Sequence, residues 1–175
     1  MDYKSLPIEQ RGAVLVVSLL MLLVMTLIGV TAMQSNIMEE KMAGNFRDVN
    51  LAFQSAETAL RDAESDLTSR VTGLTNFSAD CINGLCDATG GLLEVWKDDP
   101  NDDSDDTRAA NGVDLSTYTD TPLLPLVAQQ PQYWIEGYKV RPPGSASWKY
   151  QYRITAIGYG GNTNTQVILQ TVYAP

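Results

Sequence analysis

The stretch RGAVLVVSLLMLLVMTLIGVTAM, residues 11–33, decides the fold of this chain. No Asp, Glu, Lys or Arg occurs between Arg11 and Glu39, and from Ala13 to Met33 nearly every residue is Val, Leu, Ile, Met or Ala. At about 1.5 Å per residue, a helix over this segment is roughly 31 Å long, which matches the hydrocarbon core of a bilayer. The sequence therefore predicts a membrane-inserted helix at residues 13–33.

Three interpretations of this segment leave different mature proteins. A plain transmembrane anchor leaves the chain whole. A secretory signal peptide is cut after a core of about 7–15 apolar residues, here at Val30-Thr31-Ala32, but this apolar run is longer than that. In the third interpretation the cut falls before the run, because a polar leader, residues 1–12, ends in Gly12. The helical pattern that continues beyond the segment disfavours the secretory signal.

Beyond the membrane segment, apolar residues recur with the alternating three- and four-residue spacing of one helix face. The stripe comprises Met42, Phe46, Val49, Phe53, Ala56, Leu60, Ala63 and Leu67, and the other faces carry Arg47, Asp48, Glu57, Arg61, Asp62 and Glu64. Because the stripe mixes Phe and Ala, it favours packing against a sheet over a coiled coil. We expect one continuous helix whose amphipathic half covers residues 34–70, with the charged residues in solvent.

Residues 71–175 suffice for one globular domain and not for two. Residues 72–91 are predicted to be a loop, residues 92–97 a first strand, and residues 132–141, 148–159 and 165–173 three further strands. Aromatic residues crowd these strands, and we expect most of them to form the core and not an exposed sugar- or protein-binding patch. The predicted fold is α+β, with the long N-terminal helix packed on a small antiparallel sheet.

Composition excludes several classes of function. The net charge of −9 disfavours direct binding to phosphate backbones, so nucleic acid is not an expected partner. The chain contains no histidine, and no spacing of Ser, Lys and Asp joins a nucleophile to a base. The chain is therefore not expected to be an enzyme.

Cys81 and Cys86 are the two cysteines, and the Asn83-Gly84 pair between them turns the chain easily. A disulfide is expected if this domain lies outside the cytoplasm. Zinc is the rival, but two thiols without histidine fall short of four ligands.

The second candidate cation site is a run of acids at residues 98–106. Such a run usually forms a solvated loop. Calcium is the alternative, because oxygen ligands alternate along the run, although Ser104 replaces the expected Gly and Ala110 the closing Glu of a calcium loop. The candidate ligands are Asp99, Asn101, Asp103 and Asp105, and no other cofactor is expected.

Three segments in the first third of the chain carry a resemblance to a known family. They are QRGA with the apolar run that follows it, MEEKMAGN at residues 38–45, and NLAFQSAETALR at residues 50–61. Together they resemble the type IV pilin superfamily, and within it the PilX-type minor pilins. The last strand, at residues 167–173, is similar to the family's ending but less diagnostic.

The resemblance implies a non-enzymatic minor pilin that helps to start or complete a type IV pilus. A prepilin peptidase would cut between Gly12 and Ala13, and the new amine at Ala13 would be methylated. Before assembly the protein would sit in the bacterial inner membrane with its globular part in the periplasm, and afterwards in the pilus. The implied partners are other minor pilins, the major pilin and a tip adhesin.

The chain departs from this family pattern at Ala13, where major pilins usually have Phe, and at Val17. Counted from Ala13, Val17 occupies the fifth position of the mature chain, where most pilins carry a Glu that pairs with a neighbour's N-terminal amine. The superfamily's secretion-system tip subunit also lacks that Glu. Val17 therefore favours a place in a priming or tip complex.

Two alternatives remain. A minor pseudopilin of a type II secretion system has the same architecture, but the segment at residues 38–45 argues against it. A membrane-anchored periplasmic or surface binding module would use the acidic run, with calcium, or the aromatic residues.

Overall fold

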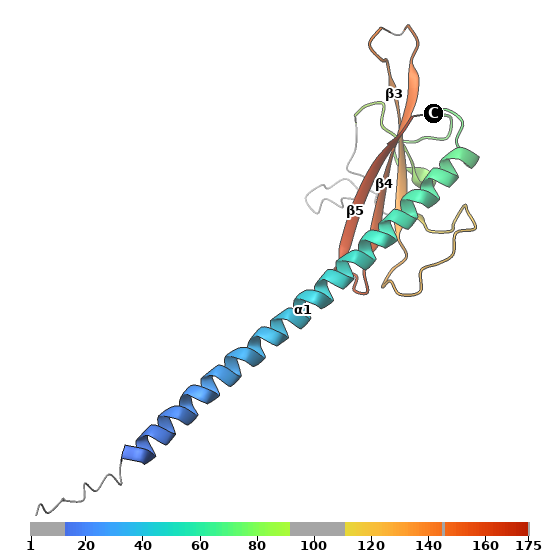
Figure 1. Cartoon of the computed structure of the whole chain (residues 1–175). Helices are drawn as coiled ribbons and strands as arrows, with labels where there is room; N and C mark the ends of the chain where they lie inside the picture. Colours follow the sequence, from blue (N-terminus) through green and yellow to red (C-terminus); the bar gives the residue numbers. More distant parts are fainter. Residues whose placement is uncertain (1–12, 92–110, 145, 175) are drawn as a thin grey trace, which may run out of the picture. The chain divides into compact units, whose positions relative to one another are not determined.

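The computed structural model describes residues 13–91, 111–144 and 146–174. Its elements in chain order are α1 (Ala13–Arg70), the short 3-10 helix η1 (Ile82–Gly84), β1 (Leu85–Asp87), β2 (Val113–Asp114), β3 (Gln132–Val140), β4 (Lys149–Tyr159) and β5 (Gln166–Tyr173) (Figure 1). The long helix, the three long strands and the α+β class confirm the predicted fold. The strand expected at residues 92–97 lies outside the described residues.

The chain divides into two compact units, Met1–Asn45 and Phe46–Pro175. Of the first unit, the structure describes residues 13–45, which are helical and exposed along their whole length. The second unit, called the head from here on, contains the rest of α1 and all the described strands. Buried residues of α1 begin at Ala52, inside the head.

The sheet is mixed, which corrects the expectation of a wholly antiparallel one. Its order is β1-β3-β4-β5, with β2 also paired to β3. β3, β4 and β5 pair antiparallel as a meander, whereas β1 pairs parallel to β3. β1 lies in the predicted loop at residues 72–91. A three-residue strand carries too little alternation to be recognised from its sequence.

Over its first turns in the head, the helix face that packs on the sheet consists mainly of alanine, which corrects the first half of the predicted stripe. Ala52, Ala56, Ala59 and Ala63 are fully buried, whereas Phe46 and Phe53 are exposed. Met42 and Val49 of the stripe are also exposed, and only its C-terminal members Ala56, Ala63 and Leu67 are buried. Alanine is required on this face because the backbone of α1 lies close to the backbone of β4, and large side chains would hold the helix away from the sheet.

Gly158 on β4 is the point of closest approach between helix and sheet. A Cβ atom placed on Gly158 would overlap the backbone of Ala52 and of Ala56. Just beyond the end of β4, the backbone N–H of Gly161 donates to Asp48 Oδ1 at 2.6 Å. The turn between β4 and β5 is thus fastened to the start of the head's helix.

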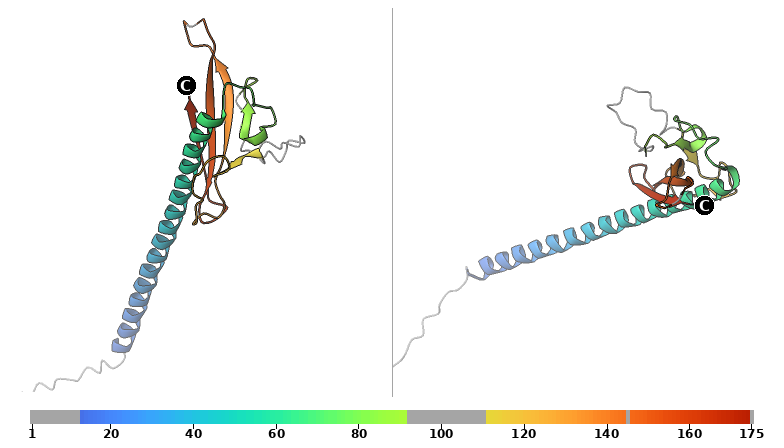
Figure 2. Two further views of the ribbon diagram at one scale, coloured as in Figure 1. Left: turned by 90° about the vertical axis from the view of Figure 1, so that its right-hand side faces the viewer. Right: turned by 90° about the horizontal axis from the view of Figure 1, so that it is seen from above.

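The central strands β3 and β4 are buried on both faces over much of their length, whereas alternate residues of β5 are exposed. In the ribbon views, the C-terminal part of α1 lies along one face of the sheet (Figure 2). Tyr133, Ile135, Ile154 and Ala156 face the helix, while the alternate residues Trp134, Ile157 and Tyr159 pack with Cys81 and Cys86 on the other side. Most aromatic residues of the strands are therefore core, as predicted. Trp148 and Tyr150, beside the turn that joins β3 to β4, are instead 63% and 40% exposed.

Candidate functional site

The first part of α1 combines full exposure with an apolar composition. Every residue from Ala13 to Asn45 is exposed, and this part of the helix is long and apolar enough to cross a membrane. Within the apolar run, at residues 13–33, the hydroxyl groups bond to the helix itself, with Ser18 Oγ donating to Leu15 O at 2.9 Å, Thr26 Oγ1 to Leu23 O at 2.8 Å and Thr31 Oγ1 to Ile28 O at 2.9 Å. These polar groups need no water, which is the condition for lying in hydrocarbon.

Of the residues predicted to serve processing and assembly, the structure describes two. Ala13 is the first residue of α1, and Val17 is 54% exposed in its second turn. No acidic residue occurs in the first turn of α1. Gly12 and the four candidate calcium ligands lie outside the described residues. Among the residues that the structure does describe, no cluster of three or more acidic or cysteine side chains is arranged to hold a metal ion.

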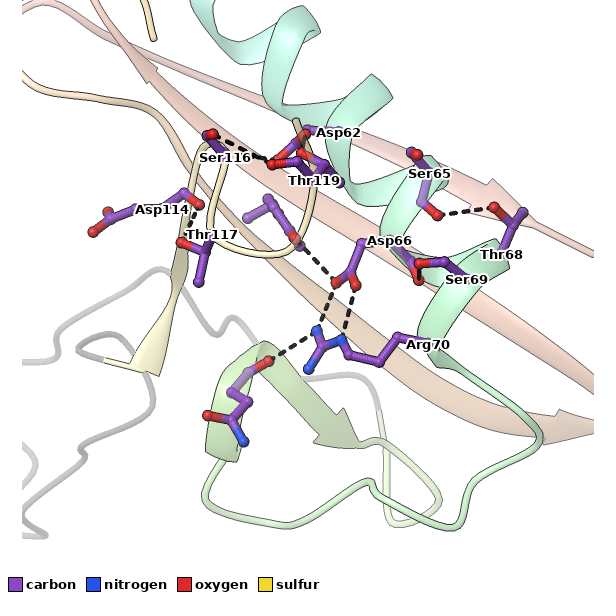
Figure 3. A network of polar contacts seen from close by, with 12 residues as sticks. Asp62, Ser65, Asp66, Thr68, Ser69, Arg70, Asp114, Ser116, Thr117 and Thr119 are labelled. Atoms are coloured by element: carbon purple, nitrogen blue, oxygen red, sulfur yellow. Dashed lines mark hydrogen bonds and ion pairs between the residues drawn. The ribbon is translucent and has the colours of Figure 1, made fainter. Parts of the chain in front are cut away.

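In the head, two carboxylates of α1 lie buried, which sequence analysis did not expect (Figure 3). Asp62, predicted to face solvent, is only 2% exposed. It accepts hydrogen bonds from Thr119 Oγ1, Thr121 Oγ1 and, at 3.2 Å, the backbone N–H of Ser116. The carboxylate therefore binds the segment at residues 116–121 to the helix, and its three donors offset the cost of burial.

Asp66, one turn later, is completely buried and holds Arg70 and Tyr133. Arg70 donates from Nε to Oδ1 at 2.8 Å and from Nη2 to Oδ2 at 2.6 Å, and Tyr133 donates from its hydroxyl to Oδ2 at 3.0 Å. Burial, and then the negative charge of Asp66, raise the pKa of the Tyr133 hydroxyl well above its ordinary value. Tyr133 therefore stays a donor, and the end of α1 is bonded to β3.

Arg70 extends this network to two further segments. Its guanidinium lies 3.8 Å from the centre of the Tyr118 ring, and Nη2 donates to the carbonyl of Asn83 at 3.3 Å. The four-residue spacing of Asp66 and Arg70 is a sequence signal for an ion pair on a helix. No comparable signal in the sequence points to Asp62, whose partners lie more than fifty residues away.

Cys81 and Cys86 form a disulfide bond, as predicted, across η1. Both half-cystines are fully buried against Trp134. The bond closes the short turn that presents the Asn83 carbonyl to Arg70.

A helix that is apolar and exposed in its first half and packed on a small mixed sheet in its second half is the pilin-like α+β arrangement. The chain belongs to the PilX family: the PilX N-terminal model matches residues 11–61, and the model of the type IV pilus assembly protein PilX C-terminal domain matches residues 58–175. Comparisons with curated proteins and with solved structures gave no match. The chain is thus a minor pilin, a structural component of type IV pilus assembly, and the family and the apolar helix together indicate membrane anchoring and pilus association.

Proposed function

We propose that this minor pilin acts without catalysis in a priming or tip complex, together with other minor pilins. The observation that carries the proposal is Val17, an apolar side chain where a carboxylate would be needed to bind a neighbouring subunit's amine. Before assembly, the globular part stands in the periplasm with the apolar helix in the inner membrane. In the pilus, the same helix buries its apolar surface against other subunits, at about 25 cal/mol for each Å² removed from water.

The physical argument concerns one unpaired charge. An N-terminal ammonium group inside an apolar bundle is costly unless a carboxylate lies beside it. This chain offers no such carboxylate. The first turn of α1 contains no acidic residue, and the side chain at the position in question, in the second turn, is Val17. Its own amine at Ala13 can still pair with a Glu of another pilin. Incorporation is therefore favourable on one side only, which suits a terminal position.

Changing Gly12 to Val is expected to abolish processing and leave an uncleaved protein in the membrane. A small residue must fit the peptidase cleft before the scissile bond, and Gly12 stands directly before the apolar run. N-terminal sequencing of the wild-type protein should begin at Ala13, with Gly12→Ala as the conservative control that stays cleavable. A mature chain that begins at Met33 would instead support the secretory signal.

Deleting the protein is expected to reduce the number of pili per cell far more than it changes the protein composition of the pili that remain.

Val17→Glu supplies the missing carboxylate, so immunogold labelling should find more copies of this variant along the shaft than of the wild type. Val16→Glu is the matched control, since it adds the same charge about 100° around the helix. Wild-type copies spaced regularly along the shaft would contradict the terminal position.

A further inference from the structure

We propose that a small cleft in the head is the anchor site for one side chain of a different pilin subunit. The cleft lies between α1, at Ser55 and Thr58, and the segment formed by residues 124–127. Its volume is ≈ 120 Å³. Pockets for small molecules usually measure about 300–1,000 Å³, so this one suits a side chain and not a cofactor or metabolite.

A buried hydroxyl group without a partner points to a ligand in this cleft. Ser55 is 1% exposed, lines the cleft, and its Oγ has no hydrogen-bond partner among the described residues. Buried hydroxyl groups in folded proteins are almost always paired, because an unpaired one forfeits its bonds to water. An occupant with a hydrogen-bonding group would supply the partner that the Ser55 hydroxyl lacks.

The wall opposite the helix is held in place before any partner arrives. The carboxamide of Gln130 bonds to both backbone groups of Leu124, donating to its carbonyl at 2.8 Å and accepting from its N–H at 3.0 Å. Beyond this wall, the N–H of Ala128 donates to the carbonyl of Gly160 at 2.8 Å. The cleft is therefore preorganised, which lowers the cost of binding.

The lining and the rim define the chemistry of the occupant. Leu51, Leu124, Pro125 and Val127 supply apolar walls, and no residue of the lining is charged. Leu126 lines the cleft and is 70% exposed, and its neighbour Leu123 is 62% exposed. A neutral, mainly aliphatic side chain with one hydrogen-bonding group fits such a site, in the manner of an interface anchor.

The occupant is assigned to another pilin because the cleft lies on the assembly helix itself. Leu51, Ser55 and Thr58 belong to α1, and under the proposed function the apolar part of this same helix joins the subunits of the pilus. This assignment rests on the proposed function. It gives the subunit a second contact with its neighbours, made by the head and separate from the apolar bundle around Val17.

Photo-crosslinking of the full-length protein in piliated cells tests the proposal. A photoreactive phenylalanine analogue at position 126 should crosslink to a different pilin, and the same group at the exposed position 68, on the last turns of α1, should not. A position-126 product containing two copies of this chain would overturn the choice of occupant, and no product would overturn the site. Crosslinks from position 17 serve as the reference: if they form while position 126 fails, only the cleft proposal falls, whereas failure of both removes the pilin-complex function as well.

Two substitutions separate binding from folding. Ser55→Ala should leave the Tm of the detergent-solubilised chain unchanged or raised, because the hydroxyl has no partner inside the head, and should reduce the position-126 crosslink several-fold. A structural role for the hydroxyl, for example on a trapped water, would instead lower the Tm and leave the crosslink intact. Ser55→Thr, which retains the hydroxyl, should preserve more of the crosslink than Ser55→Ala, and an equal loss in both variants would overturn the role of the hydroxyl.

Discussion

Replacing Asp66 with alanine is expected to lower the free energy of unfolding of the head by about 3–5 kcal/mol. The substitution leaves the guanidinium of Arg70 and the hydroxyl of Tyr133 without the acceptor that both now share. The Asp66 side chain is completely buried and that of Arg70 is 23% exposed, so water replaces the lost bonds only in part. Urea unfolding of the detergent-solubilised chain, followed by near-ultraviolet circular dichroism, measures the effect.

The same helix provides a matched control for this substitution. Glu57 and Arg61 form an ion pair with the same four-residue spacing, but their side chains are 44% and 75% exposed. Glu57→Ala is expected to cost at most about 0.5 kcal/mol, because exposed pairs on helices are screened by water. Equal costs for Asp66→Ala and Glu57→Ala would show that burial of the Asp66 pair contributes nothing to stability.

Replacing Gly158 with valine is expected to separate the helix from the sheet and to cost at least about 3 kcal/mol, the upper end of what overpacking usually costs. The new Cβ would overlap the backbone of Ala52 and Ala56, and a backbone cannot rotate away as a side chain can. The variant should therefore lose near-ultraviolet circular dichroism and become sensitive to protease at the strands.

Gly90→Val is the control for Gly158→Val, because a Cβ on Gly90 meets nothing within 4 Å. Its unfolding free energy should stay within about 0.5 kcal/mol of the wild type. Wild-type stability of Gly158→Val would mean that the helix does not dock on β4 as closely as the structure shows.

The sequence predicted the helix and the three long strands because each carries a sustained local pattern. It gave the wrong buried residues for the first turns of α1 in the head, since ranking residues by hydrophobicity places Phe46 and Phe53 inside and gives little weight to Ala52 and Ala59. The decisive quantity is the closeness of two backbones, which depends on Gly158, a residue about one hundred positions away. The hydrophobic pattern of the helix alone contains no information about that distance.

Long-range pairing also explains the remaining differences. β1 pairs parallel with β3, and nothing within Leu85–Asp87 specifies β3 as its neighbour or the direction of the pairing. Asp62 is buried because three donors from residues 116–121 meet it, and a helix pattern read alone assigns any carboxylate to solvent. The apolar segment, by contrast, is helical as expected, because its length and composition need no tertiary context.

The order of contacts along β4 determines how the head bears mechanical load. Asp48 lies at Gly161, Ala52 and Ala56 lie at Gly158, and Gly73, just beyond the helix, accepts a hydrogen bond from Tyr152. The helix thus runs alongside β4 in the opposite direction, with contacts spread over its length. Tension applied along the axis of α1 loads all of these contacts together in shear, and none of them can be peeled away first. Under the proposed function, drag on the head of an assembled subunit would therefore be carried by the alanine face of one helix together with these polar contacts.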